Sequence, residues 1–230
     1  YSTFILFALI LCVSIFSDLY FQNNYLTIIF IISTLLSTLI TYIGIPLLET
    51  IKIKQIIRKE GPKKHYRKHG TPTMGGVFFI PIGIIISNII YFNSEDYKII
   101  LVLSLLIISF MLIGLLDDLI SLKRKFNTGL TSKQKLILQF LLSLIFIIHC
   151  GSNGFIPHNI QIADKIFNVG NFIYPLGIFV LIAESNSTNL TDGLDGLLSG
   201  CSALIFTGLA ITILVQSQNI DGTLAPLCMA

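Results

Sequence analysis

The sequence predicts an all-α protein that crosses a membrane several times, and three observations support this fold class. Of the 230 residues, 53% are hydrophobic and only 12% are charged, which is about half the charged fraction of a typical soluble domain, roughly 25%. The mean hydropathy is +0.83. The apolar residues also form long uncharged runs between short polar segments, as consecutive transmembrane helices do. We expect one transmembrane domain over residues 1–230.

About seven membrane-spanning helices are expected from these runs. The second run has the length to cross a bilayer with tilt, whereas the sixth is short. Thr131 or Ser132 stands where it can cap the start of the fifth helix. The predicted spans are Ser2–Phe16, Tyr25–Leu48, Met74–Phe92, Ile99–Leu116, Lys135–Cys150, Phe172–Ala183 and Gly196–Val215.

The segment between the fifth and sixth spans does not resemble a helix. Glycine and proline interrupt it, and residues 160–164 and 166–169 alternate apolar and polar side chains. Alternation of period two is typical of a strand with one face on an apolar surface. We therefore expect a small extracytoplasmic hairpin near residues 155–170.

Both ends of the chain resemble internal positions of a longer protein. The first residue is Tyr1 rather than Met, and Ala230 lies within the apolar run Leu224–Ala230. We therefore expect the transmembrane domain to be incomplete.

The positive charges lie mostly in two polar loops, and this fixes the expected orientation. Eight of the 15 Lys and Arg residues fall in the loop 49–73, and five more fall between residues 117 and 135. Cytoplasmic loops carry an excess of Lys and Arg. Both loops are therefore assigned to the cytoplasm, and the count of spans adds a third. The predicted cytoplasmic loops are 49–73, 117–133 and 184–195.

The motif Thr-Pro-Thr-Met-Gly-Gly joins the end of the first loop to the start of the third span. Glycines allow backbone amides to approach an anion closely, and the start of a helix favours negative charge. Lys68 and Thr73 are therefore candidates for binding a phosphate. Much of the remaining basic charge in this loop is also explained by contact with anionic lipid headgroups.

The second loop opens with Asp117 and Asp118 at the end of the fourth span. The alternative explanation for these two acids is that they have no function and lie in water at the end of a helix. However, two acids at a helix C-terminus oppose the helix dipole, at about 0.3–1 kcal/mol each, and acids at the membrane edge are usually functional. We predict that one binds metal or accepts a proton while the other positions it. Lys133 follows as a further candidate cation.

The third loop, 184–195, contains Asn186, Asn189, Asp192 and Asp195 and no cation. If it is helical, the members of each pair, Asn186 with Asn189 and Asp192 with Asp195, share a face, since they are three residues apart. Such a set suits contacts with metal, hydroxyl groups or a nucleobase. The spacing of a calcium-binding EF-hand loop is missing, and a plain polar connector is the remaining alternative.

These three loops together resemble a known family. Lys68–Gly76, Asp117–Asp118 and Asn186–Leu197 are similar to the three signatures of the phospho-N-acetylmuramoyl-pentapeptide transferase family. This family belongs to the polyprenyl-phosphate N-acetylhexosamine-1-phosphate transferase superfamily. The resemblance covers residue 25 to the end of the chain, and the Thr-Pro-Thr-Met-Gly-Gly form favours the muramoyl-pentapeptide branch.

The resemblance implies a magnesium-dependent transfer of phospho-N-acetylmuramoyl-pentapeptide from the UDP-sugar to undecaprenyl phosphate, with release of UMP, which forms the first lipid-linked intermediate of peptidoglycan synthesis. It implies catalytic roles for Asp117 and Asp118 in a one-step or a two-step route, and Mg²⁺ ligands Asp117 and Asp192. The implied substrate-binding residues are Lys68, Thr73, Lys133, Asn189, Asp192 and Asp195.

The resemblance also implies a multi-pass protein of the inner membrane whose site faces the cytoplasm, and a homodimer. The expected partners are the UDP-sugar, undecaprenyl phosphate and the lipid bilayer, and no nucleic acid is among them.

The sequence departs from the pattern of this family in two respects. Ser121 stands where many members have Lys, and the family continues for about three more spans, so the chain alone is expected to be inactive.

Three other functions stay open from the sequence. One is a transferase that uses UDP-N-acetylglucosamine. Another is a non-catalytic membrane protein. The third is a transporter, which would place ionisable groups near midspan and show internal repeats, whereas these spans carry almost no charge.

Overall fold

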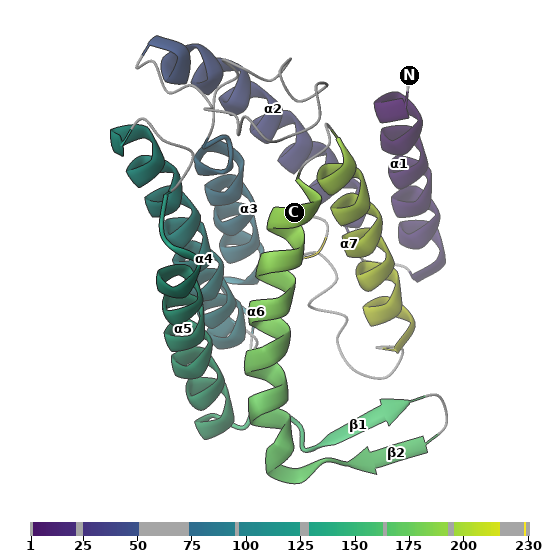
Figure 1. The fold of residues 1–230 in the computed structure, drawn as a ribbon. Helices are drawn as coiled ribbons and strands as arrows, with labels where there is room; N and C mark the ends of the chain where they lie inside the picture. The colour runs from purple at the N-terminus through teal and green to yellow at the C-terminus, as the bar shows by residue number, and fades with distance from the viewer. Residues whose placement is uncertain are drawn as a thin grey trace. The chain divides into compact units, whose positions relative to one another are not determined.

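The computed structural model describes residues 2–21, 25–50, 74–94, 97–124, 129–162, 165–192, 196–216 and 228. Within these ranges the chain is almost entirely helical, with one small hairpin (Figure 1). The helices are α1 (Ser2–Phe21), α2 (Leu26–Thr50), α3 (Gly76–Tyr91), α4 (Tyr97–Arg124), α5 (Ser132–Ser152), α6 (Ile173–Thr191) and α7 (Leu197–Gln216).

The all-α polytopic membrane class is confirmed. Within the described ranges, five helices are long and apolar enough to cross a membrane, namely α1, α2, α4, α5 and α7. The other two predicted spans also form helices, but α3 has only 16 residues and α6 carries a polar C-terminal part, Glu184–Thr191. The number of helices therefore matches the prediction, whereas fewer of them have the length and composition of a full span.

Two helices continue well beyond their predicted ends, so part of the predicted loops 117–133 and 184–195 is helical. Helix α4 ends at Arg124, and α6 ends at Thr191. The prediction stopped each helix where the apolar run stopped, but backbone hydrogen bonding does not require apolar side chains. In α6 the Ser187 and Thr188 hydroxyls donate to the carbonyl of Glu184. The cytoplasmic location of both segments stays a prediction.

The predicted hairpin near residues 155–170 is present. Strand β1 (Asn159–Ile162) pairs antiparallel with β2 (Lys165–Asn168), and Asn159 lies opposite Asn168. The side chains of β2 are exposed. Gly170 follows with a φ of 51°, a conformation that glycine adopts at little cost. It leads the chain into α6.

The chain divides into two compact units, which are described separately. The first unit comprises residues 1–51, 75–101 and 191–230, and it contains α1, α2, α3 and α7. Its core is formed by Ile10, Leu26, Ile29, Ala210 and Leu214. Both carboxylate oxygens of Asp18 accept backbone N–H groups, from Leu26 at 3.0 Å and from Thr27 at 2.9 Å. An acid that binds these free amides stabilises the start of α2.

The second unit comprises residues 52–74 and 102–190, and it contains most of α4, α5, the hairpin and α6. Two glycines make room for side chains between α5 and α6. A Cβ on Gly177 would lie 2.8 Å from Ile147 Cδ1, and a Cβ on Gly151 would lie 2.5 Å from Tyr174 Cε1. A larger residue at either position would displace the side chain that packs there. The candidate site lies in this unit, toward the opposite end of the two helices.

Candidate functional site

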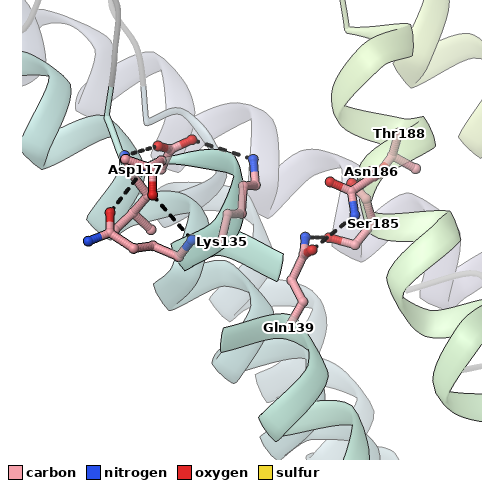
Figure 2. A network of polar contacts seen from close by, with 9 residues as sticks. Asp117, Lys135, Gln139, Ser185, Asn186 and Thr188 are labelled. Carbon is pink, nitrogen blue, oxygen red and sulfur yellow. Dashed lines mark hydrogen bonds and ion pairs between the residues drawn. The ribbon is translucent and has the colours of Figure 1, made fainter. Parts of the chain in front are cut away.

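Asp117 is held in place by two contacts from the start of α5 (Figure 2). Its Oδ1 accepts the N–H of Leu130 at 2.7 Å, and its Oδ2 lies 3.4 Å from Lys135 Nζ. The Asp117 side chain is 28% exposed and that of Lys135 is 17% exposed. Partial burial strengthens the attraction between the two charges, so the carboxylate is held in one direction.

The backbone before α5 is folded directly onto Asp117. Gly129 is buried, and a Cβ at this position would collide with Oδ1 and the carbonyl oxygen of Asp117. Arg124 Nη1, at the end of α4, donates to the Gly129 carbonyl at 3.2 Å. Glycine is therefore required here for the close approach. The backbone at Gly129 and Leu130 and the Asp117 carboxylate therefore stabilise each other.

Thr131 begins α5 as its N-cap, which was one of the two predicted caps. The Thr131 hydroxyl accepts the Gln134 N–H at 3.3 Å, and Gln134 Oε1 accepts the Thr131 N–H at 3.0 Å. This capping box satisfies two of the free amides at the helix start. It sets where the first turn of α5 lies, and thereby where Lys135 stands relative to Asp117.

Asp118 follows Asp117 on the same helix but not on the same face. Successive residues of an α-helix are about 100° apart around its axis, so two neighbouring carboxylates do not converge on one point. The Asp118 side chain is half-buried. The sequence reasoning anticipated this divergence, and the two acids are therefore treated as separate groups.

A second polar cluster joins α5 to α6. Gln139 is 1% exposed. Its Nε2 donates to Ser185 Oγ at 3.0 Å, and its Oε1 accepts Asn186 Nδ2 at 2.9 Å. Asn186 Nδ2 also donates to the Ile182 carbonyl at 2.8 Å. Figure 2 shows Gln139 reaching from α5 toward Ser185 and Asn186.

The remaining predicted site residues are dispersed. Lys133 is exposed on the first turn of α5, Asn189 is exposed near the end of α6, and Asp192 is exposed just beyond it. Asp192 belongs to the first unit, and its position relative to the α4–α6 cluster is not described. Lys68, Thr73 and Asp195 lie outside the described residues. Their roles in substrate binding stay predictions.

Two residues of this cluster were not predicted as site residues. Lys135 was assigned as the start of a span, and Gln139 was not singled out. A signal for both was present, because Gln139 is the one polar side chain between residues 136 and 142. A polar group in a membrane span needs a partner. Lys135 lies four residues earlier, on the same helix face.

Among the residues that the structure describes, no group of three or more His, Cys, Asp or Glu side chains could hold a metal ion. Mg²⁺ does not need such a group, because it binds through one or two carboxylates together with water and substrate phosphates. Each Asp117 oxygen accepts one bond and keeps a second lone pair. The donor chemistry therefore fits Mg²⁺.

Comparison with known proteins identifies the family. Residues 100–230 match the model of glycosyl transferase family 4, and residues 68–80 match signature 1 of the phospho-N-acetylmuramoyl-pentapeptide-transferases. A phospho-N-acetylmuramoyl-pentapeptide-transferase of Prochlorococcus marinus (strain NATL2A) is 68% identical over 98% of this chain and 61% of its own length.

Two further relatives with the same name come from Prochlorococcus marinus (strain MIT 9313) and Synechococcus sp. (strain CC9605). They are 46% and 42% identical, over 96% and 98% of this chain and 60% and 65% of their own lengths. The chain thus spans less than two thirds of the length of these curated relatives. It belongs to glycosyl transferase family 4, and its residues 68–80 carry signature 1 of the phospho-N-acetylmuramoyl-pentapeptide-transferases.

Proposed function

We propose that the protein transfers phospho-N-acetylmuramoyl-pentapeptide from its UDP-linked form to undecaprenyl phosphate, releasing UMP. One observation carries this proposal: the segment 68–80 matches the signature of the phospho-N-acetylmuramoyl-pentapeptide-transferases within a chain that is 68% identical to a protein of that name. The apolar helices support it, because one of the two substrates is a membrane lipid.

The chemistry brings together two negatively charged phosphates. Such a transfer depends on in-line positioning and on neutralising charge more than on covalent groups of the protein. Lys68 and Lys133 are the proposed cations for the substrate phosphates, and Thr73 is a proposed hydrogen-bonding partner. Asn189, Asp192 and Asp195 are proposed to contact the nucleotide sugar.

Asp117 and Asp118 are proposed to act on the lipid phosphate. A carboxylate here would orient or deprotonate the attacking phosphate in a one-step route, or attack the sugar-linked phosphate in a two-step route. The contacts with Leu130 and Lys135 hold Asp117 in one orientation. A fixed carboxylate loses less freedom when substrate binds.

Mg²⁺ is part of the proposal, and when bound it would neutralise charge on the diphosphate. Asp117 and Asp192 are its proposed ligands. We also propose that the protein lies in the inner membrane as a homodimer, with the site open to the cytoplasm. The excess of Lys and Arg in the loops 49–73 and 117–133 supports this orientation, because cytoplasmic loops carry such an excess.

The experiment measures UMP release in membranes or detergent. The 230-residue chain is expressed alone, and also joined to the part of the NATL2A relative outside the 226 aligned residues. With undecaprenyl phosphate and Mg²⁺, UDP-N-acetylmuramoyl-pentapeptide should release UMP and UDP-N-acetylglucosamine should not. Release from UDP-N-acetylglucosamine alone would favour the other branch of the superfamily, and chelation of Mg²⁺ should stop the reaction.

A further inference from the structure

We infer that Gln139 is a positioning residue, whose buried amide fixes the rotation of α6 so that its polar face, Asn186 and Asn189, keeps one setting relative to α5 and Asp117. This inference rests on the proposed function for its consequence, because there Asn189 contacts the nucleotide sugar. Its structural basis is independent of that function and lies in the contacts of Gln139.

The burial of Gln139 requires a reason. The side chain is 1% exposed, and its neighbours in α5 from Leu136 to Leu142 are otherwise apolar. An amide removed from water is costly unless its N–H and C=O groups are paired. An apolar residue would fill this position at lower cost, so the amide is expected to serve its partners on α6.

The contacts restrict α6 to one rotation. The two ends of the amide bind consecutive residues, Ser185 at 3.0 Å and Asn186 at 2.9 Å. Consecutive side chains point about 100° apart around a helix, so only one setting of α6 places both within reach of the same amide. The bond from Asn186 to the Ile182 carbonyl fixes the Asn186 side chain as well.

One face of α5 holds both neighbouring helices. Lys135 and Gln139 are four residues apart and therefore lie on the same side of the helix. Lys135 contacts Asp117 of α4, and Gln139 contacts α6, as Figure 2 shows. Helix α5 thus sets the orientation of the acid on α4 and of the polar end of α6 within a single turn.

A rotation of α6 would also change the direction of Asn189. Asn189 is three residues beyond Asn186, on the same face, and its side chain is exposed, where a substrate can reach it. If the Gln139 contacts are lost, α6 is free to rotate, and this face turns away from its present direction. Binding of the nucleotide sugar should then weaken more than binding of the lipid phosphate.

The test compares Gln139→Leu with Ser143→Ala. Ser143 lies one turn further along the same face of α5 and is 0% exposed, but its hydroxyl has no hydrogen-bond partner within the part of the chain described here. Amide hydrogen exchange over residues 184–191 is the first measurement. The second is KM for each substrate in the form of the protein that releases UMP.

Gln139→Leu should accelerate exchange over residues 184–191 by roughly tenfold, the effect of two lost side-chain bonds in a membrane protein. KM for the nucleotide sugar should rise roughly fivefold or more, while KM for undecaprenyl phosphate changes less. Ser143→Ala should change neither quantity. Exchange in Gln139→Leu that equals exchange in Ser143→Ala would overturn the inference.

Two further variants keep the test decisive if Gln139→Leu does not fold. Ser185→Ala and Asn186→Leu remove the same bonds from the side of α6. Each alone should accelerate exchange over residues 184–191 relative to Ser143→Ala. Where Gln139→Leu folds, combining either variant with it should add little further acceleration, because residues of one network are not additive. Additive effects would contradict a shared role. Faster exchange in a protein without UMP release would refute the proposed function alone, and the positioning role would stand.

Discussion

Replacing Asp117 with Asn tests the structural and the chemical role of this residue in one variant. The amide keeps the shape of the side chain and an oxygen that accepts the Leu130 N–H. It removes the negative charge and places an N–H₂ or a neutral oxygen beside Lys135 Nζ, which lies 3.4 Å from Oδ2 in the present structure.

The expected loss of stability follows from two contacts. A hydrogen bond to a charged acceptor contributes about 1.5–3 kcal/mol and a neutral one about 0.5–1.5 kcal/mol, so weakening the 2.7 Å bond from Leu130 costs about 1 kcal/mol. Loss of the partly exposed ion pair adds about 0.2–1 kcal/mol. The total of about 1–2 kcal/mol corresponds to roughly 2–8 °C in the melting temperature at 2–4 °C per kcal/mol.

The assay combines thermal unfolding in detergent with turnover. Lys135→Met removes the cation and keeps an apolar stem. It should therefore lower the melting temperature only by the amount that the ion pair contributes, because the hydrogen bond from Leu130 is kept. Turnover of Asp117→Asn should fall by about 10²–10⁴-fold, the usual contribution of a catalytic acid or base. An unchanged melting temperature would refute the contacts described for Asp117. Unchanged turnover would refute its catalytic role.

Substitutions at three further positions test the backbone around this site and in the first unit. Gly129→Ala should destabilise the protein by about 1–3 kcal/mol, because the new Cβ collides with Asp117 and overpacking has this cost; a melting temperature equal to the wild type would contradict the close approach. Thr131→Ala should cost about 1 kcal/mol through loss of the cap, and Thr131→Gly a few tenths; hydrogen exchange at the Gln134 amide checks this, and equal values in both variants would argue against the capping box. Asp18→Ala should cost about 1 kcal/mol for the same reason at the start of α2, with faster exchange at the Leu26 and Thr27 amides; unchanged exchange there would show that Asp18 does not cap the helix.

The fold class and the order of the elements were predictable because they follow from the length and spacing of apolar runs along the sequence. Uncharged runs predicted the positions of the seven helices that lie within the described residues, and alternation in residues 160–169 predicted the hairpin. The ends of the helices were not predictable from apolar runs. Leu119, Ile120 and Leu122 continue α4 beyond Asp117 to Arg124, and polar side chains bond to the backbone of α6 itself.

The candidate site was predicted only in part, for a physical reason. The motifs pointed to residues with unusual chemistry in loops, and Asp117 is indeed held by specific contacts. Lys135 and Gln139 were overlooked because each lies in what the sequence presents as a span, where side chains are expected to pack. Their partners are 18 and 46 residues away along the chain, and such pairings arise only from tertiary structure.

The identity of the nucleotide product tests the central claim most directly. A sugar-1-phosphate transfer leaves the sugar-linked phosphate on the lipid and releases UMP, whereas transfer of the sugar alone releases UDP. Chromatography of the nucleotide formed from UDP-N-acetylmuramoyl-pentapeptide and undecaprenyl phosphate separates the two, and mass spectrometry of the lipid identifies its diphosphate. The account predicts UMP and a diphospho-linked lipid in equal amounts. Release of UDP, or UMP release over many turnovers without undecaprenyl phosphate, would contradict it.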